Sequence, residues 1–475
     1  MFLSVYTLGC KLNQLETEAV SDSFQREGFT LVPFGQIDQL GKIEQIEYID
    51  QTDNSERQAE EPGIIVINTC TVTSMAEQKA RRVIRKALKE HKRACVIVTG
   101  CYAQMDKAGL DALEETHGLS GRLFVIPGEK KDRLLDLARY ITGVADVDDL
   151  SRLIASWLAD NSTEAPDGTF RFAPESFSSH SRGFIKIQDG CDRSCAYCRV
   201  SIARGKSRSL AADEVLRRLQ TLEQSGYSEA VLTGVNISLY RDSSRELPGL
   251  LELLLSETAA IRLRLSSIEP DMITDELLRV LENSRIRPHF HLTLQSGSAE
   301  ILRGMGRIYT PGDAAKKAEL LRMARNDPFL ACDIIAGFPG EIEDEFTKTF
   351  ELCEEINFAW IHAFPFSPRP GTAAFDFSGK VSEKEKTYRV ERLNGLAVRG
   401  RREYTRRWEG KEVEAVVERG KRLPKGLAAA VSENYLKIRV KYGDDTHPSP
   451  GSLIRCRIKS IPADSNFDAT AEMTV

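Results

Sequence analysis

The sequence lacks any long hydrophobic run. Nowhere in its 475 residues is there a stretch of about 18 apolar residues, the length that would span a bilayer as a helix. Its beginning, MFLSVYTLGCKLNQ, lacks the basic and apolar regions of a secretory signal peptide. We therefore expect a cytoplasmic protein with no membrane partner.

A large charge of either sign is also missing. The net charge of -5 argues by itself neither for nor against a nucleic-acid partner, and 41% hydrophobic with 28% charged residues is typical of a globular protein. A chain of 475 residues exceeds what one core usually supports, so we expect two to four domains. Its ten cysteines, without a signal peptide, favour thiols, metal ligands or core residues over a disulfide framework.

The first part of the chain alternates apolar runs with helical patterns. Parallel strands are expected at FLSVYTLG (2–9), IIVINT (64–69), CVIVTG (95–100) and RLFVIPG (122–128). Asn13 with Glu16, and Ser74 with Glu77, resemble capping boxes at helix starts. The pattern predicts a doubly wound α/β domain over residues 1–142. Residues 36–62 are interpreted as a surface insertion, because the second strand should otherwise come sooner.

Residues 143–181 are polar and irregular, and they predict a linker. A new alternation follows, with strands expected at 184–188, 229–234, 261–266, 290–295, 330–337 and 359–364. Six βα units in a row predict a partial, TIM-like (β/α)6 barrel over residues 182–403, with its chemistry at the carboxyl ends of the strands. Short strands separated by Gly, Pro and Asn then predict a small all-β barrel over 404–475.

No fourth cysteine stands near GCDRSCAYC (190–198), which brings together a first trio, Cys191, Cys195 and Cys198. A second trio follows the ends of expected strands of the first domain, so neighbouring loops of one sheet would bring it together: Cys10, Cys70 and Cys101. The remaining cysteines lie within expected strands or on a helix, and are interpreted as small buried hydrophobes: Cys95, Cys332, Cys353 and Cys456.

Two kinds of metal site suit such trios. A structural zinc site wants a closed tetrahedron of four ligands, so His180, His289 or His291 would have to complete the barrel trio. An iron–sulfur cluster takes cysteine thiolates, and three of them around four irons leave one iron open to an exogenous ligand. The cluster is the favoured interpretation, and a non-catalytic zinc-binding RNA module is the alternative from another class.

At this point the motifs carry a family resemblance. CDRSCAYC at the end of the first expected barrel strand resembles the CxxxCxxC signature of radical-SAM enzymes. The segments TLGCKLNQLETE, NTCTVT and GCYAQ are similar to those of the methylthiotransferases, and the match continues in SSIEP (266–270), HLTLQSGS (291–298), MGRIYT (305–310) and DIIAGFPGE (333–341). The expected terminal barrel resembles the RNA-binding TRAM domain.

Within that family, GCKLNQLETE is most similar to the branch that modifies threonylcarbamoyladenosine beside the anticodon of tRNA. Two residues depart from the family pattern: Arg199 stands where an apolar residue is common, and Ser201 stands near the place of a proline. Methylthiolation of isopentenyladenosine in tRNA, or of a ribosomal protein side chain, remains the alternative within the family.

The resemblance implies an enzyme that adds a 2-methylthio group to N6-threonylcarbamoyladenosine in tRNA, with two 4Fe–4S clusters and S-adenosyl-L-methionine as cofactors. The cluster on Cys191, Cys195 and Cys198 would bind S-adenosylmethionine and, on one-electron reduction, yield a 5′-deoxyadenosyl radical that takes hydrogen from carbon 2 of the adenine. The cluster on Cys10, Cys70 and Cys101 would deliver sulfur. A one-electron donor such as flavodoxin or ferredoxin is implied, while the sulfur donor is unknown.

Side chains at the strand ends of the expected barrel are candidates for binding S-adenosylmethionine. Tyr197 resembles the family's aromatic residue near the adenine of the cofactor. The other candidates are assigned by position: Thr233, Gly234, Asn236, Ser266, Ser267, Glu269, Gln295, Ser296, Gly297 and Asp333. Asp333 lies inside an expected strand, where a buried carboxylate needs a partner.

Positive charge gathers in two segments that are candidates for contact with tRNA. KARRVIRKALKEHKR (79–93) is strongly basic and has one apolar face at helical spacing, so it is either an RNA-phosphate contact or a solvated outer face. VRGRREYTRRWEG (398–410) combines arginines with Tyr404 and Trp408, which suits phosphate contact and base stacking.

Overall fold

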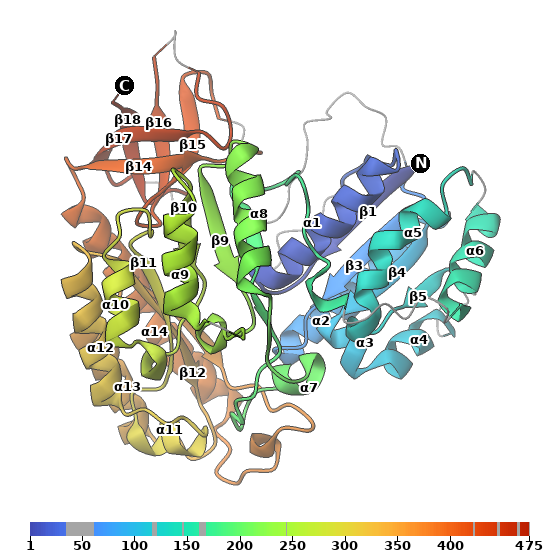
Figure 1. The fold of residues 1–475 in the computed structure, drawn as a ribbon. Coiled ribbons are helices and arrows are strands. Elements are labelled where there is room, and N and C mark those ends of the chain that lie inside the picture. The colour runs from blue at the N-terminus through green and yellow to red at the C-terminus, as the bar shows by residue number, and fades with distance from the viewer. Residues whose placement is uncertain are drawn as a thin grey trace. The chain divides into compact units, whose positions relative to one another are not determined.

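The computed structural model describes residues 1–34, 61–115, 121–144, 147–160, 168–243, 245–420, 423–443, 447–462 and 466–474. Residues 36–60 of the expected insertion therefore lie outside the described residues. The described chain divides into two compact units (Figure 1). The first contains Met1–Ser179, Asp189–Asp192 and Arg199–Lys206, and the second contains His180–Gln188, Arg193–Cys198 and Ser207–Val475.

The first unit is built on a parallel sheet with the strand order β2-β1-β3-β4-β5. Its strands are β1 (Phe2–Thr7), β2 (Thr30–Leu31), β3 (Ile64–Thr69), β4 (Cys95–Gly100) and β5 (Leu123–Val125). Every residue of β3, β4 and β5 is buried, as expected of strands covered on both faces. All the strands expected in this domain are confirmed, and β2 is a short addition.

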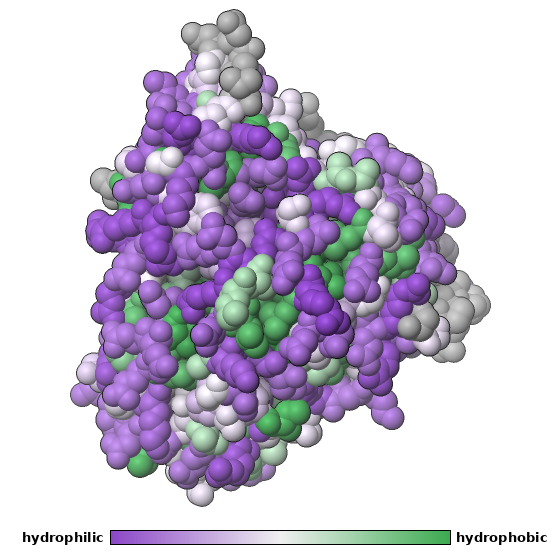
Figure 2. Space-filling view, turned by 60° about the vertical axis from the view of Figure 1, so that its left-hand side comes forward, coloured by the Kyte–Doolittle hydropathy of each residue, from purple (hydrophilic) through white to green (hydrophobic). Residues whose placement is uncertain are grey.

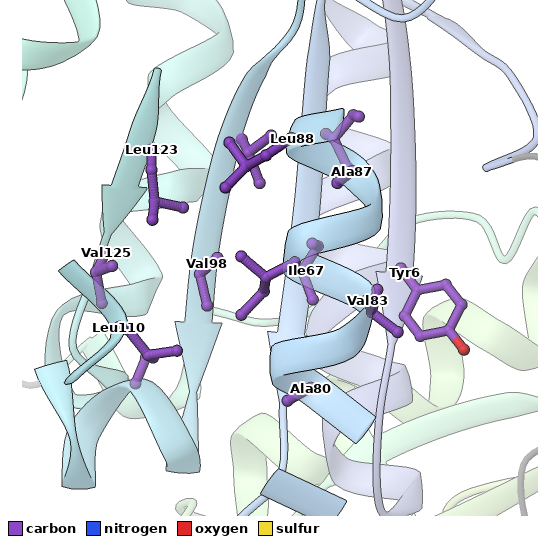
Figure 3. Close-up of a cluster of buried hydrophobic side chains, with 14 of the residues drawn as sticks. Tyr6, Ile67, Ala80, Val83, Ala87, Leu88, Val98, Leu110, Leu123 and Val125 are labelled. Carbon is purple, nitrogen blue, oxygen red and sulfur yellow. The ribbon is translucent and has the colours of Figure 1, made fainter. Parts of the chain in front are cut away.

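Helices cover both faces of this sheet, which confirms the doubly wound α/β domain. The helices and 3₁₀ turns of the unit are α1 (Lys11–Arg26), α2 (Ser74–Glu90), α3 (Cys101–Met105), α4 (Lys107–Glu115), η1 (Gly128–Arg133), α5 (Leu134–Tyr140), α6 (Val147–Ala159), η2 (Gly168–Phe170) and α7 (Val200–Arg204). On one face, Val83 and Leu88 of α2 share a core with Ile67 and Val98 (Figure 3). The opposite core includes side chains from α1, α5 and α6.

The helix starts differ from those expected. Helix α1 begins at Lys11 with Cys10 in the N-cap position, and the Asn13 amide instead donates to the carbonyls of Leu8 (2.7 Å) and Thr69 (3.1 Å). Helix α2 is capped by Thr73 rather than Ser74. The side chain in the N-cap position is chosen by the loop geometry, which the spacing of two polar residues does not fix.

The segment 143–181 is not irregular throughout. Residues 147–159 form α6, so the prediction of an irregular linker is wrong for them. The helix has an apolar face whose residues Leu150, Ile154 and Trp157 are buried in the core of the first unit. Its periodicity is the signal that the polar surroundings of the segment concealed.

The second unit contains the partial barrel, and all six of its expected strands are confirmed. They are β6 (Gly183–Lys186), β9 (Glu229–Thr233), β10 (Arg262–Leu265), β11 (His289–Gln295), β12 (Phe329–Ala336) and β13 (Trp360–Pro365). Strands β6-β9-β10 and β11-β12-β13 form parallel sheets, and a parallel bridge between Ile268 and Leu292 links them. The short strands β7 (Gln188–Asp189) and β8 (Arg208–Ser209) pair with each other.

The helices of this part follow the strands in alternation (Figure 1). They are α8 (Ala212–Gln224), α9 (Leu247–Ser256), α10 (Asp275–Leu281), α11 (Ala299–Gly304), α12 (Pro311–Ala324), α13 (Glu343–Ile356) and α14 (Glu383–Arg407), with 3₁₀ turns η3 (Ile237–Leu239), η4 (Pro270–Met272) and η5 (Ala373–Phe375). No helix in the described ranges is long and apolar enough to cross a membrane. Hydrophilic residues cover most of the face in Figure 2, and hydrophobic residues form separate patches on it.

The end of the chain is the expected all-β barrel, closed in the order β14-β15-β16-β18-β17. Its strands are β14 (Glu412–Val417), β15 (Leu427–Ser432), β16 (Lys437–Lys441), β17 (Leu453–Ser460) and β18 (Ala469–Met473). The prediction that Tyr404 and Trp408 stack on bases is wrong, because both rings are buried in the core that joins α14 to this barrel. Their apolar area is used for packing, and the Tyr404 hydroxyl donates to the Asp327 carbonyl.

A buried ion network lies at the amino end of the partial barrel. Glu229 at the start of β9 accepts hydrogen bonds from Arg264 (2.6 Å) and Arg287 (2.8 Å), and all three side chains are at most 1% exposed. Arg287 also binds Glu414 of β14 at 2.9 Å. Burial raises the pKa of Glu229, but the attraction of Arg264 and Arg287 outweighs it and lowers that pKa to about 2. The carboxylate therefore stays ionised inside the unit.

Candidate functional site

The second cysteine trio lies where three strands of the first sheet end. Cys10 follows β1 and precedes α1, Cys70 follows β3 directly, and Cys101 opens α3 directly after β4. Strands β1, β3 and β4 are parallel neighbours in the sheet, so their carboxyl ends share one edge. The structure thus brings together the loops that the sequence assigned to this trio.

A glycine with positive φ directly precedes Cys10, Cys101 and Cys191. Gly9 has φ of 104° and Gly100 has φ of 99°, values at which a side chain is strained. A Cβ on Gly9 would lie 2.9 Å from the Cys70 sulfur, and one on Gly100 would lie 2.4 Å from the Thr69 carbonyl oxygen. Gly190, before Cys191, has φ of 70° and approaches the backbone of Lys206. Glycine therefore permits the close approach of these loops.

The thiols of this trio interact electrostatically. Burial raises the pKa of Cys70 to about 12, and the charges of Cys101 and Cys10 contribute in the same direction. A cation offsets this repulsion, because Nε of Arg204 donates to the Cys101 sulfur at 3.2 Å. A bound cation or cluster that keeps all three thiols deprotonated would relieve the remaining repulsion.

Arg204 is the centre of a buried polar network in the first unit. It donates to Asn13 at 2.9 Å, to Glu16 at 3.0 Å and to Asp189 at 3.1 Å. Lys131 pairs with the same Glu16 at 2.5 Å. Burial lowers the pKa of Arg204, but interactions with Asp189, Cys101 and Glu16 outweigh it, so that pKa lies above its ordinary value. Arg204 consequently remains a cation beside the cysteines.

Arg199, which departs from the family pattern, has partners of its own. Its guanidinium lies 3.1 Å from Glu77 and 3.4 Å from the hydroxyl of Thr71, the residue after Cys70. The Arg199 and Glu77 side chains are 11% and 12% exposed, so the cation is matched in a nearly buried place. The structure gives no account of Ser201.

The barrel trio is divided between the two units, and each cysteine is described within its own. In the first unit, the amide of Cys191 donates to the Gly205 carbonyl at 3.0 Å. In the second unit, the amide of Cys198 donates to the Cys195 carbonyl at 3.0 Å, so the two cysteines share one tight turn. An arginine again reaches a cysteine sulfur, because Nη1 of Arg307 lies 3.3 Å from Sγ of Cys195.

A buried polar chain connects Cys195 with the strand ends of the partial barrel. Arg307 contacts Cys195 on one side and the Glu269 carboxylate on the other. Glu269 accepts from the Asn236 amide at 3.1 Å, and the Asn236 backbone donates to the Gln188 side chain at 2.8 Å. Asn236 and Glu269, both expected to bind cofactor, therefore lie in one network with Cys195.

Several other candidates have closely packed surroundings. Thr233 is buried as the last residue of β9. A Cβ on Gly234 would lie 2.8 Å from the Gln188 carbonyl oxygen, so only glycine fits there. Ser266 and Ser267 are partly exposed directly after β10. These positions place backbone at the carboxyl ends of the strands, where the partial barrel is expected to bind its ligand.

The segment 295–297 is placed by contacts with α13. Gln295 ends β11 with φ of 66°. The Ser296 hydroxyl lies 3.1 Å from the Thr349 hydroxyl, and the Gly297 amide donates to the same oxygen at 3.0 Å. A Cβ on Gly297 would lie 2.6 Å from Cα of Thr349. The described contacts of Ser296 and Gly297 thus fix this loop onto helix α13.

Asp333 has the partner that its place in a strand required. It lies 2.9 Å from Nε2 of His291, whose strand β11 is the neighbour of β12. The His291 ring stacks on His362 of β13 at a centroid distance of 5.0 Å. Burial raises the pKa of Asp333, but the two histidines outweigh it, and the resulting pKa is below the ordinary value. His291 and His362 were not among the candidates for cofactor binding.

Tyr197 packs beside a small hydrophobic core that includes Ala196, Met305 and Phe338. Burial raises the pKa of its hydroxyl well above the ordinary value, against the opposing charge of Arg307. The hydroxyl is therefore neutral near pH 7. Tyr197 directly precedes Cys198 in the turn that Cys195 opens.

The remaining cysteines and histidines have structural surroundings. The four cysteines interpreted as core residues are confirmed, because each is 0% exposed: Cys95, Cys332, Cys353 and Cys456. His180 packs on Phe184, and His289 stacks on Tyr435. Within the described residues, no group of three or more His, Cys, Asp or Glu side chains is arranged to hold a single metal ion. In a four-iron cluster each cysteine instead binds a different iron.

The sequence interpretation missed the arginines of both cysteine sites. Arg204 and Arg307 each donate to a cysteine sulfur, and neither was named as a candidate. Arg307 lies in MGRIYT (305–310), a segment whose resemblance was recognised, and Arg204 stands before Gly205, shortly after Cys198. An arginine beside a glycine in each of these segments was the available signal.

Comparison with known proteins adds the family. Residues 185–353 match the Radical SAM superfamily, and residues 43–120 match the uncharacterized protein family UPF0004. The threonylcarbamoyladenosine tRNA methylthiotransferase MtaB of Treponema pallidum is 37% identical to the chain over 502 residues, covering 96% of the chain and 97% of that protein. MtaB of Bacillus subtilis is 31% identical over 463 residues, covering 96% and 93%.

A relative named for another substrate is also similar. The tRNA-2-methylthio-N(6)-dimethylallyladenosine synthase of Thermodesulfovibrio yellowstonii is 29% identical over 420 residues, covering 87% of each chain. The chain is thus similar to named methylthiotransferases over nearly its whole length, and it carries the cysteine motifs. It belongs to the radical-SAM methylthiotransferase family, enzymes that transfer a methylthio group with S-adenosyl-L-methionine and 4Fe–4S clusters as cofactors.

Proposed function

We propose that this enzyme adds a 2-methylthio group to N6-threonylcarbamoyladenosine next to the anticodon of tRNA. The observation that carries the substrate is the 37% identity, over nearly the whole chain, to a relative named for that nucleoside. GCKLNQLETE, the segment most similar to that branch, contributes Asn13 and Glu16 to the network beside the cysteines. A substrate on tRNA is consistent with a cytoplasmic enzyme.

Two 4Fe–4S clusters fit the two cysteine trios. Cys10, Cys70 and Cys101 would hold one, and Cys191, Cys195 and Cys198 the other. In each case an arginine lies within 3.3 Å of a cysteine sulfur, which suits thiolate ligands rather than neutral thiols. Bound at these residues, the clusters and S-adenosylmethionine would supply the one-electron chemistry and the sulfur that an unactivated carbon 2 requires. A flavodoxin- or ferredoxin-type protein is the proposed electron donor.

The chain's own residues would hold and orient the cofactor. Thr233, Gly234, Asn236, Ser266, Ser267 and Glu269 place backbone and polar groups at the strand ends, and we propose that they hold S-adenosylmethionine together with Tyr197, Gln295, Ser296, Gly297 and Asp333. Glu269 and Arg307 fix each other as an ion pair, so neither needs to rearrange when the ligand binds. Orientation of this kind is what the protein adds to the reactivity of its cofactors.

Helix α2 supports a tRNA partner. Arg82, Arg85 and Lys89 are exposed along one side of it, and no ion pair of theirs is found in the described part of the chain. The exposed side chains of Val72 and Met75 precede them beside Cys70. A row of unmatched cations is suited to RNA phosphates, whereas cations of α14 such as Arg401 are matched by carboxylates.

The test is a reaction with defined tRNA. The protein is reconstituted without oxygen, supplied with S-adenosylmethionine, a reductant and tRNA bearing threonylcarbamoyladenosine, and the digested nucleosides are analysed by mass spectrometry. The proposal expects a 2-methylthio product that disappears in Cys191→Ala and in Cys70→Ala but persists in Cys353→Ala, a control at a buried cysteine. Modification of isopentenyladenosine or of a protein instead would refute the substrate and leave the family.

A further inference from the structure

Helix α7 follows the barrel cysteines in sequence but belongs to the first unit. It begins two residues after Cys198, and residues Arg199–Lys206 are packed within the unit that carries Cys10, Cys70 and Cys101. Its N-cap residue Arg199 and its last residue Arg204 both direct their guanidinium groups into that unit. A helix of five residues has little stability of its own, so these side chains fix its place.

Arg204 holds two of the three cysteine loops. Its Nε donates to the Cys101 sulfur at 3.2 Å, while its terminal nitrogens bind Asn13 and Glu16 in the first turns of α1, the helix that begins directly after Cys10. The Arg204 side chain is 7% exposed and the Glu16 side chain 1%. One planar, permanently charged group thus bridges the Cys10 and Cys101 loops away from water.

Arg199 holds the third loop. Its guanidinium pairs with Glu77 at 3.1 Å in the first turn of α2 and lies 3.4 Å from the Thr71 hydroxyl. That hydroxyl in turn donates to Glu77 at 2.5 Å. Thr71 is the residue directly after Cys70, so the pair fixes the backbone that carries this cysteine.

Because all three loops are bound by one short segment, we propose that Arg199 and Arg204 are positioning residues for the cluster of Cys10, Cys70 and Cys101. The inference rests on the proposed function, since it requires that this trio holds an iron–sulfur cluster. We call the segment Arg199–Lys206 the α7 clamp. It sets the separation of the loops before the cluster is bound, and Arg204 also places a hydrogen-bond donor and a positive charge on one ligand sulfur.

The charge and hydrogen bond of Arg204 should shift the reduction potential of the cluster in a definite direction. The reduction potential of an iron–sulfur cluster depends on net charge and on hydrogen bonds to its sulfurs. A reduced cluster carries one more negative charge, which the Arg204 cation stabilises. Removing that cation while keeping a polar side chain, as in Arg204→Gln, therefore makes the midpoint potential of this cluster more negative. A loss of iron alone would not distinguish the clamp from general loosening, but the potential does.

The experiment uses the full-length chain with Cys191, Cys195 and Cys198 replaced by alanine, so that any cluster belongs to the first unit. Iron and sulfide per chain are measured after anaerobic reconstitution, and the midpoint potential is measured by an EPR-monitored redox titration. Arg204→Gln is expected to lose at least half of the iron and to shift the remaining cluster to a more negative potential. Arg204→Lys, which keeps the charge but not the planar fork, is expected to shift it less.

The control is Arg307→Gln in the same background. Arg307 donates to the sulfur of Cys195, which is absent there, so iron and potential should equal those of the background. Arg199→Glu is expected to lower iron, and the exchange of charges in Arg199→Glu with Glu77→Arg to restore it at least in part. This pair tests the clamp even if Arg204→Gln fails to fold, which circular dichroism reports.

The outcomes separate the two claims. If the background chain binds no iron, the trio holds no cluster, and both the proposed function and the clamp are wrong. If it binds iron, but Arg204→Gln and Arg199→Glu keep the iron content and the potential of the background, the clamp alone is wrong. Loss with Arg199→Glu and no recovery in the exchanged pair would refute the role of the Arg199–Glu77 contact.

Discussion

Replacing Gly100 by alanine tests whether the close packing of the cysteine loops matters for cluster binding. At φ of 99° and ψ of -168°, a conformation essentially restricted to glycine, a non-glycine residue costs about 1–3 kcal/mol from its backbone alone. The new Cβ would also lie 2.4 Å from the Thr69 carbonyl oxygen, whereas real Cβ atoms stay beyond 3.0 Å. The loop before Cys101 would therefore have to move away from Thr69 by more than half an ångström.

Thr69 cannot yield easily. Its carbonyl accepts from the Asn13 amide at 3.1 Å, and its hydroxyl donates to the Thr99 carbonyl at 2.5 Å. Overpacking of such a buried contact costs about 1–3 kcal/mol beyond the strain of the backbone. Because Asn13 also holds the Leu8 carbonyl, the displacement is passed to the loop of Cys10.

Gly28 is the matched control, since it has φ of 85° and an added Cβ would meet no atom within 4 Å. Gly28→Ala should bring the strain of a positive φ without a close contact. In the chain without the barrel cysteines, we expect Gly100→Ala to reduce iron per chain severalfold and to speed amide exchange in residues 64–105. Gly28→Ala should keep its iron. Equal iron contents in the two variants would refute the reasoning from contact.

Three further predictions concern stability and RNA binding. Glu229→Gln should destabilise the second unit by about 3–5 kcal/mol in urea unfolding, because buried guanidinium groups lose their counter-ion, whereas Glu252→Gln, an exposed control, should change it little. The folded pKa of Glu229 is about 2, below the ordinary value of 4.5. Its contribution to the free energy of unfolding is therefore complete above pH 4.5 and is lost as the pH falls towards 2. Urea midpoints that decline equally with pH in the Glu229→Gln variant would contradict this. Arg82→Glu with Arg85→Glu should weaken tRNA binding, measured by filter binding, and reduce the slope of log K against log salt concentration by roughly 2. The control is Arg139→Glu, at another exposed arginine of the unit. An equal loss of binding in that variant would show that overall charge rather than helix α2 is responsible.

The strands were predictable because burial on both faces imposes a pattern that few other structures produce. In the runs at 64–69 and 95–100 no residue is charged, and both runs are buried without exception. Since parallel strands end at one edge, the same reasoning placed Cys10, Cys70 and Cys101 on neighbouring loops. The sequence pattern was therefore sufficient to predict the buried strands and the loops that follow them.

Long-range polar contacts were not predictable in this way. Arg204 and Cys101 are 103 positions apart, and Arg204 and Glu16 are 188 apart. No periodicity connects such residues, and a buried cation has no apolar signature. Tyr404 and Trp408 illustrate the opposite error, because a basic and aromatic composition suggested an RNA surface while the rings are core residues. Composition does not say which face of a helix is covered.

The interleaved division of the chain has a consequence for dissecting the enzyme. A gene fragment that ends at Ser179 encodes only the first part of the first unit, because Asp189–Asp192 and Arg199–Lys206 come later in the sequence. In that fragment Glu16 would keep Lys131 as a counter-ion but lose Arg204. The first unit is thus not one contiguous segment of the sequence. A chimera that exchanges this unit between relatives must include both later segments.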